Sequence, residues 1–177
     1  MAISLYDFTV SPFQITLGAM EGVLEKGRSF CAENDIALAD VVSTRLHDDM
    51  LPFHFQIVSL WHHSLGALKG VQAGEFSPPP KMERDYAGLQ ELVRQARTGL
   101  DEFTRQRVEG FAGKDVVFKL GQRSMPFIAE DFLASFSLPN FHFHATTAYD
   151  ILRIQGVPLG KRDYLGQLKL KADNSSQ

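Results

Sequence analysis

The sequence lacks the features of disulfide-stabilised and membrane-spanning proteins. Among its 177 residues there is one cysteine, Cys31, so no internal disulfide can form, which fits a reducing cytosol. Its place in a helical pattern favours a buried packing thiol over a nucleophile. No apolar run approaches the ~20 residues that a membrane span requires. No Lys or Arg precedes Lys26, so the basic start of a secretory signal is missing. We expect a cytoplasmic protein.

An excess of positive charge is also missing. The formal net charge is −3 and the isoelectric point is near 6.0, so no basic field attracts nucleic acid or an anionic membrane. Hydrophobic residues make up 44% of the chain and charged residues 22%, which are ordinary values for a globular protein. We expect a single domain over residues 1–170, followed by a flexible tail at 171–177.

Sharp catalytic motifs are absent as well. The chain contains no GxGxxG, P-loop, GxSxG, HExxH or CxxC sequence. What remains is six histidines, four of them in two close pairs, His62-His63 and His142-Phe143-His144. The residues alone therefore name no reaction, no catalytic group and no cofactor.

Helical periodicity dominates the rest of the pattern. Apolar residues recur at spacings of three and four over four long stretches, at about 8–33, 52–71, 86–103 and 130–155. A short helix is expected within 37–46, and the three prolines at 78–80 predict a stiff, extended crossover. The mixed charges on the third stretch indicate a solvated face. These features predict a mainly α-helical protein, with a four-helix bundle as the architecture.

Two interruptions of this pattern carry predictions. Between the third and fourth helices, β-branched and aromatic runs at 115–120 and 125–128 flank a Gly-containing turn, which predicts a small β-hairpin. Pro139 lies inside the fourth helical pattern, so we expect a kink or break near 137–138 that turns Asn140 and His144 into the bundle. Residues 160–166 should form a strap with Tyr164 and Leu165 packed against the helices.

The second and fourth helices each carry a stripe of small and polar residues. Neighbouring helical residues point about 100° apart, so each histidine pair should supply one ring to the interior. A solvated surface would instead be rich in Lys and Glu, so the two stripes are expected to face each other across a polar cavity. The residues that would line it are Gln56, Ser59 and His63 on the second helix and Asn140, His144 and Thr147 on the fourth.

A purely structural interpretation of these stripes stays open. Small residues on a helix face also permit close packing, and a neutral histidine can be buried with one hydrogen bond on each ring nitrogen, for example His63 to Gln56 or His144 to Asn140. Asp48 and Asp49 have two uses as well. They can cap the helix that begins at Pro52, or supply a carboxylate to the mouth of the cavity.

The fourth helix and the segment after it resemble a known group of proteins. The runs LPNFHFHATTAY at 138–149, ILR at 151–153 and GVPLGKRDYLG at 156–166 are similar to a family of uncharacterised bacterial and fungal proteins in the DinB/YfiT-like helical-bundle superfamily. Shorter matches extend this resemblance over nearly the whole chain, at Ser4-Leu5-Tyr6-Asp7, Arg45-Leu46, Asp49-Met50, Pro52, Gln56 and His63.

The resemblance implies an up-down-up-down bundle, often dimeric. For the superfamily it also implies a divalent metal held by three histidines. His63 matches the ligand on the second helix and His144 the first ligand on the fourth, but the third position falls on Ala148, which cannot ligate. A replacement carboxylate would have to come from Asp7, Asp48 or Asp49. Because this ligand is missing, we expect a protein without a bound metal slightly more than one that holds Zn, Ni or Fe.

Three functional hypotheses follow. The first is a divalent-metal-dependent enzyme of transferase or hydrolase type, or one in which His63 and His144 act as acid and base. The second is a non-catalytic bundle that binds a small molecule without metal. The third is an interaction module that works through a homodimer surface. None of them includes nucleic acid or a membrane as a partner.

Overall fold

The computed structural model of the protein describes residues 4–171, so all but the first residue of the tail expected at 171–177 lies outside the described residues. Most of the chain is helical, and the helices of its first half, apart from the short first one, correspond to the expected stretches. They are α1 (Leu5–Phe8), α2 (Val10–Glu33), α3 (Leu38–Ser43), α4 (Phe53–Trp61), a π-helical turn (His62–Gly66) and α5 (Ala67–Ala73).

The second half contains the remaining helices. They are α6 (Tyr86–Gly99) with a 3-10 turn (Leu100–Glu102), α7 (Arg105–Glu109), α8 (Ala129–Asp131), a second π-helical turn (Phe132–Ser137), α9 (Leu138–Ile154) and α10 (Lys161–Leu165). The helix α7 was not expected from the sequence. Within the described residues, no helix is both long enough and apolar enough to span a membrane.

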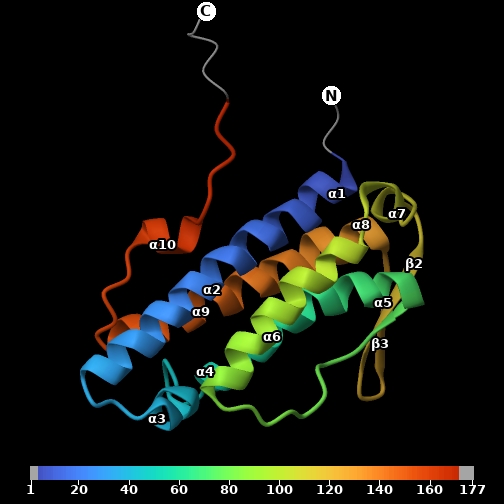
Figure 1. The fold of residues 1–177 in the computed structure, drawn as a ribbon. Coiled ribbons are helices and arrows are strands. Elements are labelled where there is room, and N and C mark those ends of the chain that lie inside the picture. Colours follow the sequence, from blue (N-terminus) through green and yellow to red (C-terminus); the bar gives the residue numbers. More distant parts are fainter. Residues whose placement is uncertain (1–3, 172–177) are drawn as a thin grey trace, which may run out of the picture.

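The long helices lie side by side around one core (Figure 1). The helix α4 packs against both α6 and α9, and α2 packs against α6. Phe13, Leu17, Phe53, Leu89 and Phe141 are fully buried between them. Cys31 is also fully buried, and burial raises the pKa of its thiol, as expected for a packing residue.

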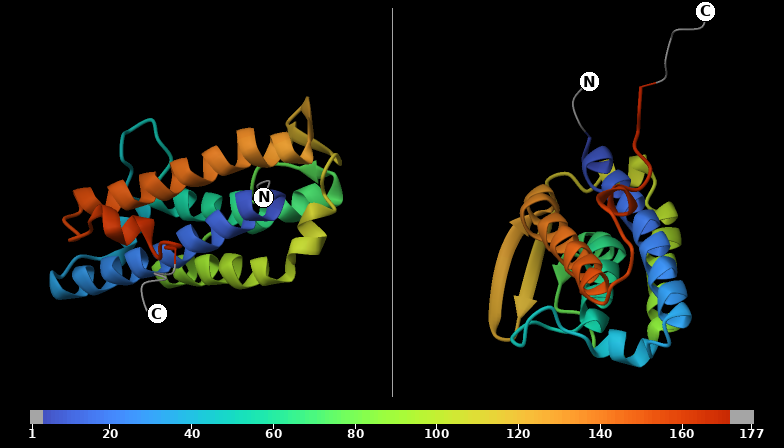
Figure 2. Two further views of the ribbon diagram at one scale, coloured as in Figure 1. Left: turned by 90° about the horizontal axis from the view of Figure 1, so that it is seen from above. Right: turned by 90° about the vertical axis from the view of Figure 1, so that its left-hand side faces the viewer.

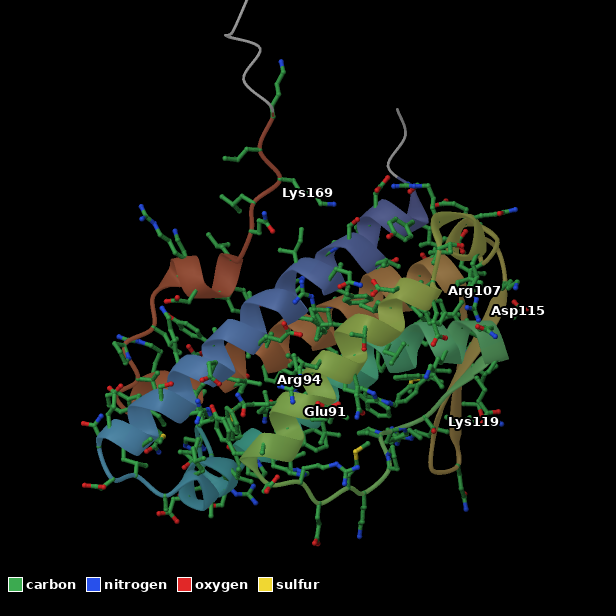
Figure 3. The ribbon with its side chains drawn as sticks, in the orientation of Figure 1. Glu91, Arg94, Arg107, Asp115, Lys119 and Lys169 are labelled. Atoms are coloured by element: carbon green, nitrogen blue, oxygen red, sulfur yellow. The ribbon has the colours of Figure 1, made fainter. Side chains whose placement is uncertain are left out.

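A close approach between α2 and α6 depends on Gly27. A Cβ atom at this position would lie 2.5 Å from the hydroxyl of Tyr86 and 3.1 Å from a methyl group of Leu152. The absence of a side chain lets the Tyr86 hydroxyl donate a 2.8 Å hydrogen bond to the carbonyl of Leu24. The charged residues of α6, such as Glu91 and Arg94, lie on its outer face (Figure 3).

The expected hairpin is present and belongs to a three-stranded sheet. The strands β2 (Asp115–Leu120) and β3 (Arg123–Ile128) pair antiparallel, with Phe118 opposite Met125. The turn is shorter than expected, because Arg123 and Ser124 already belong to β3. The strand β1 (Glu75–Phe76) pairs parallel with β2 and was missed, since two residues are too few to produce a periodic pattern. The hairpin lies at one side of the helices (Figure 2).

The break expected at Pro139 does not occur. Ser137 and Leu138 keep helical dihedral angles, with φ and ψ of −73° and −47° and of −63° and −45°, and the helix continues to Ile154. The π-helical turn ends just before the proline, which then occupies the first turn of α9, where a missing N–H is tolerated. The amide of Asn140 donates to the carbonyl of Phe136 at 2.7 Å, so a side chain satisfies a carbonyl beside the transition.

The C-terminal strap is the helix α10, which packs against α2. Lys26 of α2 forms a 2.6 Å ion pair with Asp163, and Tyr164 is half-buried as expected. Leu165, by contrast, is 41% exposed, so the expectation that it packs was wrong. Gly166 has a φ of 62° and passes so close to α2 that a Cβ atom there would lie 3.0 Å from the Cβ of Ala19.

The Tyr86 contact yields a stability prediction. We expect Tyr86→Phe to lower the free energy of unfolding by about 1 kcal/mol, because a buried hydrogen bond is lost while the ring still fills its site. Urea unfolding monitored by circular dichroism measures this change. The matched control is Tyr149→Phe, since that hydroxyl has no hydrogen-bond partner within residues 4–171. Equal stability of parent and Tyr86→Phe would contradict this account of the α2–α6 contact.

Candidate functional site

The first histidine of the candidate site, His63, lies in the π-helical turn between α4 and α5. Its side chain is buried, with the residue 8% exposed. The neighbouring His62 is buried as well, but its polar contact is with the crossover that follows β1. Its ring stacks on Phe76 with centroids 4.2 Å apart, and its Nε2 lies 2.7 Å from the carbonyl oxygen of Ser77. His62 therefore serves to fix the crossover that follows β1.

The second histidine, His144, lies on α9 and is half-buried. The ring of His142 points elsewhere, toward the hydroxyl of Tyr164 in α10, at 3.3 Å. The two pairs thus each send one ring to the α4–α9 interface, as the helical geometry predicts.

His63 and His144 meet between the helices. Their ring centroids are 6.0 Å apart and their planes differ by 18°, so the rings lie nearly parallel. Aromatic side chains surround the pair. The ring of Phe136 is 5.6 Å from that of His63, and the ring of Phe55 is 5.7 Å from that of His144. The expected approach of the two histidines is confirmed.

Gln56 determines the protonation pattern of His144. Its Nε2 donates a 2.7 Å hydrogen bond to the carbonyl of Leu51, and this acceptor fixes the orientation of the amide. The amide oxygen then lies 2.7 Å from Nδ1 of His144 and accepts a hydrogen bond from Nδ1–H. Gln56 is only 2% exposed, so both bonds are shielded from water. His144 consequently carries its proton on Nδ1 and keeps a lone pair on Nε2.

Ser137 has the corresponding place beside His63. Its hydroxyl donates to the carbonyl of His63 at 2.9 Å, and the same oxygen is 3.4 Å from Nδ1 of the ring. Since the hydroxyl proton is already used, the oxygen is available to Nδ1 only as an acceptor. This leaves the lone pair of His63 on Nε2 too. The contact joins the two π-helical turns, because Ser137 ends the second and His63 belongs to the first.

Sequence reasoning missed Ser137, although a signal was present. The residues of the polar stripe on the fourth helix are three or four positions apart, and Ser137 lies three positions before Asn140. Extending the stripe by one turn would have found it. Because we expected a kink or break near 137–138, we did not extend the stripe to Ser137.

The Nε2 atoms of the pair are not fully buried. Neither atom has a hydrogen-bond partner among the described residues. Among the described residues, one fully buried side-chain nitrogen or oxygen lacks a hydrogen-bond partner, and it is Nε2 of His54. The Nε2 atoms of His63 and His144 do not belong to this class. Lone pairs on nitrogens that are not fully buried are suited to accept hydrogen bonds or to ligate a cation.

Both imidazoles are neutral at physiological pH. Burial, together with the neighbouring rings of His62 and His144, lowers the pKa of His63 to about 3. Burial also lowers the pKa of His144 to about 4. The pair therefore presents acceptors and not positive charges.

The other residues expected at the site have different places. Ser59 is buried in α4, the hydroxyl of Thr147 donates to the carbonyl of Phe143 at 2.8 Å, and Asn140 bonds within its own helix. Asp49 lies in the exposed loop before α4, where its carboxylate is 2.7 Å from Nδ1 of His47. The clefts at His54, Gln14, Glu25 and Lys69 are lined by neither His63 nor His144.

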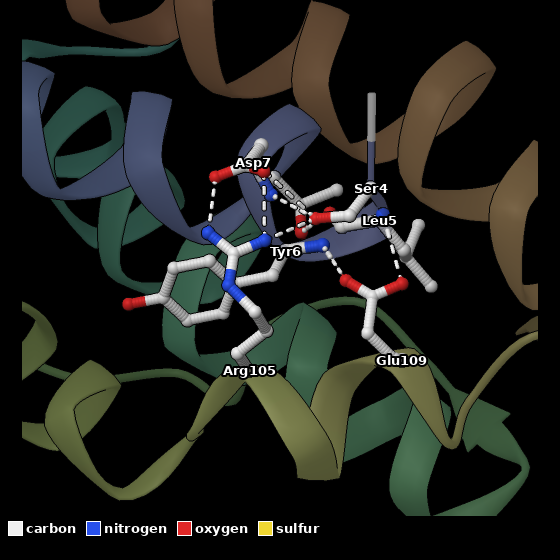
Figure 4. A network of polar contacts seen from close by, with 7 residues as sticks. Ser4, Leu5, Tyr6, Asp7, Arg105 and Glu109 are labelled. Carbon is white, nitrogen blue, oxygen red and sulfur yellow. Dashed lines mark hydrogen bonds and ion pairs between the residues drawn. The ribbon is translucent and has the colours of Figure 1, made fainter. Parts of the chain in front are cut away.

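Asp7 lies away from the two histidines and forms an ion pair with Arg105. Its carboxylate pairs with Arg105, which lowers its pKa to about 2, and Glu109 accepts the backbone N–H groups of Leu5 and Tyr6 (Figure 4). The opening Ser4–Asp7 segment is thus tied to α7 and serves to anchor the N-terminal turn.

A three-histidine metal centre does not fit these residues. Ala148, at the position of the third ligand, is fully buried among apolar neighbours. Residues 4–171 hold no cluster of three or more His, Cys, Asp or Glu side chains placed to bind a metal ion. Two imidazoles are fewer than the three or four protein ligands that zinc sites take.

Comparison with known proteins identifies the family. The protein family described as "Domain of unknown function (DUF1993)" matches residues 5–165. The chain belongs to this family. A crystal structure of a DinB family member protein from Shewanella denitrificans is similar to it, with a TM-score of 0.79, 25% sequence identity, and 95% of each chain covered. No match was found among curated proteins. The resemblance noted from the sequence is therefore confirmed, and the fold is that of a DinB-like protein.

The neutral histidines predict loss of stability in mild acid. Their pKa values in the unfolded chain are near 6.5, so the unfolded state binds more protons as pH falls below 6.5, until the folded rings protonate near pH 3 to 4. For His63, lowering the pH from 7 to 5 should cost roughly 2 kcal/mol. Urea unfolding at pH 7, 6 and 5 measures the effect.

Two variants attribute this pH dependence to the site. His63→Gln should reduce the loss of stability between pH 7 and 5 by roughly 2 kcal/mol, the share of His63, while His144 still contributes its own. His47→Gln, at an exposed loop position, should leave the profile of the parent unchanged. A parent profile that is flat over this interval would show that His63 is not held neutral by burial.

Proposed function

We propose that the protein is a small-molecule-binding member of its family, and that His63 and His144 form the binding site without a three-histidine metal. The observation that carries this proposal is the pair of Nε2 lone pairs, each oriented by a hydrogen-bonding group at Nδ1. Such a pair accepts hydrogen bonds from an uncharged ligand that carries O–H or N–H groups, while Phe55 and Phe136 pack against its apolar part.

The low basicity of the rings favours binding over acid–base catalysis. A general base works best when its pKa lies near the operating pH. The pKa values of about 3 and about 4 lie about four and three units below neutrality, so proton transfer to either ring would be strongly uphill. Acceptance of a hydrogen bond needs no proton transfer and is unaffected.

A metal-dependent enzyme of transferase or hydrolase type is the second candidate. One observation favours it, namely that each Nδ1 is held by a polar group while Nε2 stays free, as is usual for histidines that bind metals. The absence of a third ligand weighs against it, because two imidazoles alone hold a divalent ion weakly. Metal binding is therefore included as an outcome of the test.

Further expectations are part of the same proposal. We infer a single domain with up-down-up-down four-helix topology in a cytoplasmic homodimer. Support for the dimer comes from α9, where Phe143 and Ile154 are 57% and 60% exposed. Eleven residues correspond to about three helical turns, so both side chains lie on one face. Two large apolar side chains on one face are suited to be buried against a second copy of the chain.

The proposal is tested by titrating untagged protein with acetamide, 1-propanol, Zn²⁺ and Co²⁺ in parallel. We expect at least one of the two uncharged donors to shift the imidazole nitrogen signals of His63 and His144 together, saturably. This response should disappear in His144→Ala. Elemental analysis should find less than one metal ion per chain, with no change in His63→Ala or His144→Ala.

Two results would overturn this function. One tightly held metal ion per chain, lost in either variant, would establish the metal-dependent alternative. Signals of both rings that respond to neither donor would leave the pair as a structural contact. Ser59→Ala is the matched control, because Ser59 is buried in the same helix and lies outside the hydrogen bonds of the pair.

A further inference from the structure

The loop between α3 and α4, residues 44–52, is closed at its base by hydrogen bonds. The backbone N–H of Phe53 donates to the carbonyl of Thr44 at 2.8 Å, which brings the two ends of the loop together. The Thr44 hydroxyl accepts a 3.2 Å hydrogen bond from Gln155, the residue after α9, so the base is attached to that helix as well. The loop stands out from the helices beside α9 (Figure 2). Compact surface loops with joined ends are frequently functional.

Inside the loop, Arg45 fixes the peptide that precedes Leu51. Its guanidinium donates to the carbonyl of Met50, five residues along the chain. On the other side, Pro52 follows Leu51, and a residue before proline is restricted to extended backbone. The φ of Pro52 is itself fixed by its ring, at −70°. The Leu51 carbonyl therefore takes its orientation from a peptide held by Arg45 and from the proline, because it precedes the first residue of α4.

The Leu51 carbonyl begins a series of contacts that ends at His144. It accepts the 2.7 Å hydrogen bond from Gln56, whose amide oxygen accepts from Nδ1–H of His144. If the loop moved the Leu51 carbonyl away, the amide would be free to turn over and donate from its NH₂ group to Nδ1. The His144 proton would then lie on Nε2. The ring would present a hydrogen-bond donor there instead of an acceptor.

We propose that the loop at 44–52 sets the hydrogen-bonding character of the binding site, with Arg45 as its positioning residue. While Arg45 holds the loop, His144 carries its proton on Nδ1 and accepts a hydrogen bond from a ligand. When the loop is released, part of the protein carries this proton on Nε2 and rejects ligands that need an acceptor there. Arg45 acts on the ring through the loop backbone and Gln56. This inference rests on the function proposed for the His63–His144 pair and adds a control on it.

The test reads the tautomer of His144 from its imidazole nitrogen signals, in the full chain at pH 7 without ligand. In the parent, the form with the proton on Nε2 should stay below about one-tenth, because two buried acceptors would face each other in it. Arg45→Met keeps a long side chain and removes the donor, so it should raise this form to roughly one-third or more. Arg45→Lys can still donate to the Met50 carbonyl and should stay close to the parent.

Arg84→Met is the matched control. Arg84 is also exposed and donates to a backbone carbonyl, that of Glu83, but it lies on the crossover before α6. This variant should leave the His144 tautomer as in the parent, and the His63 signals should stay unchanged in every variant. An unchanged His144 tautomer in Arg45→Met, or equal shifts of His63 and His144, would overturn the inference. Because no ligand is present, these results are separate from a failure of the proposed function, which would appear as a parent that responds to neither acetamide nor 1-propanol.

Discussion

The Gln56 side chain is the interaction on which the candidate site depends. Its amide nitrogen donates to the Leu51 carbonyl and its amide oxygen accepts from His144, so one buried group links the loop before α4 to the ring on α9. A buried amide with both ends paired has a single favourable orientation, since exchanging its ends would place oxygen against oxygen. That constraint leaves the lone pair of His144 on Nε2. If the amide were absent, either tautomer of His144 would be possible.

The two π-helical turns give this arrangement its geometry. One contains His63 and the other ends at Ser137, and the Ser137 hydroxyl joins them by donating to the His63 carbonyl. A π-helical turn inserts a residue into an α-helix, which shifts the side chains that follow and frees carbonyl groups. Such turns are frequent at functional sites. Here the two turns lie opposite each other, so the Ser137 hydroxyl of one turn donates to the His63 carbonyl of the other.

Much of this structure was predictable from the amino-acid pattern, and the exceptions have physical causes. The apolar spacing predicted the long helices, and the small polar stripes predicted that His63 and His144 lie on facing surfaces. The π-helical turns have no residue signature comparable to a cap or a proline, so the pattern predicted a break at Pro139 where the helix in fact continues. The strand β1 depends on Phe76 packing under β2, a contact between distant segments. The Gln56–Leu51 bond, which decides the tautomer, likewise depends on how a loop folds back.

The central claim is that both rings of the pair are neutral and carry their protons on Nδ1. It is tested most directly by a long-range proton–nitrogen correlation spectrum of the imidazoles in the parent protein at pH 7, assigned with His63→Gln and His144→Gln. The account predicts that both rings are uncharged, with protonated Nδ1 and unprotonated Nε2. A charged ring at this pH, or a proton on Nε2 of either residue, would contradict it.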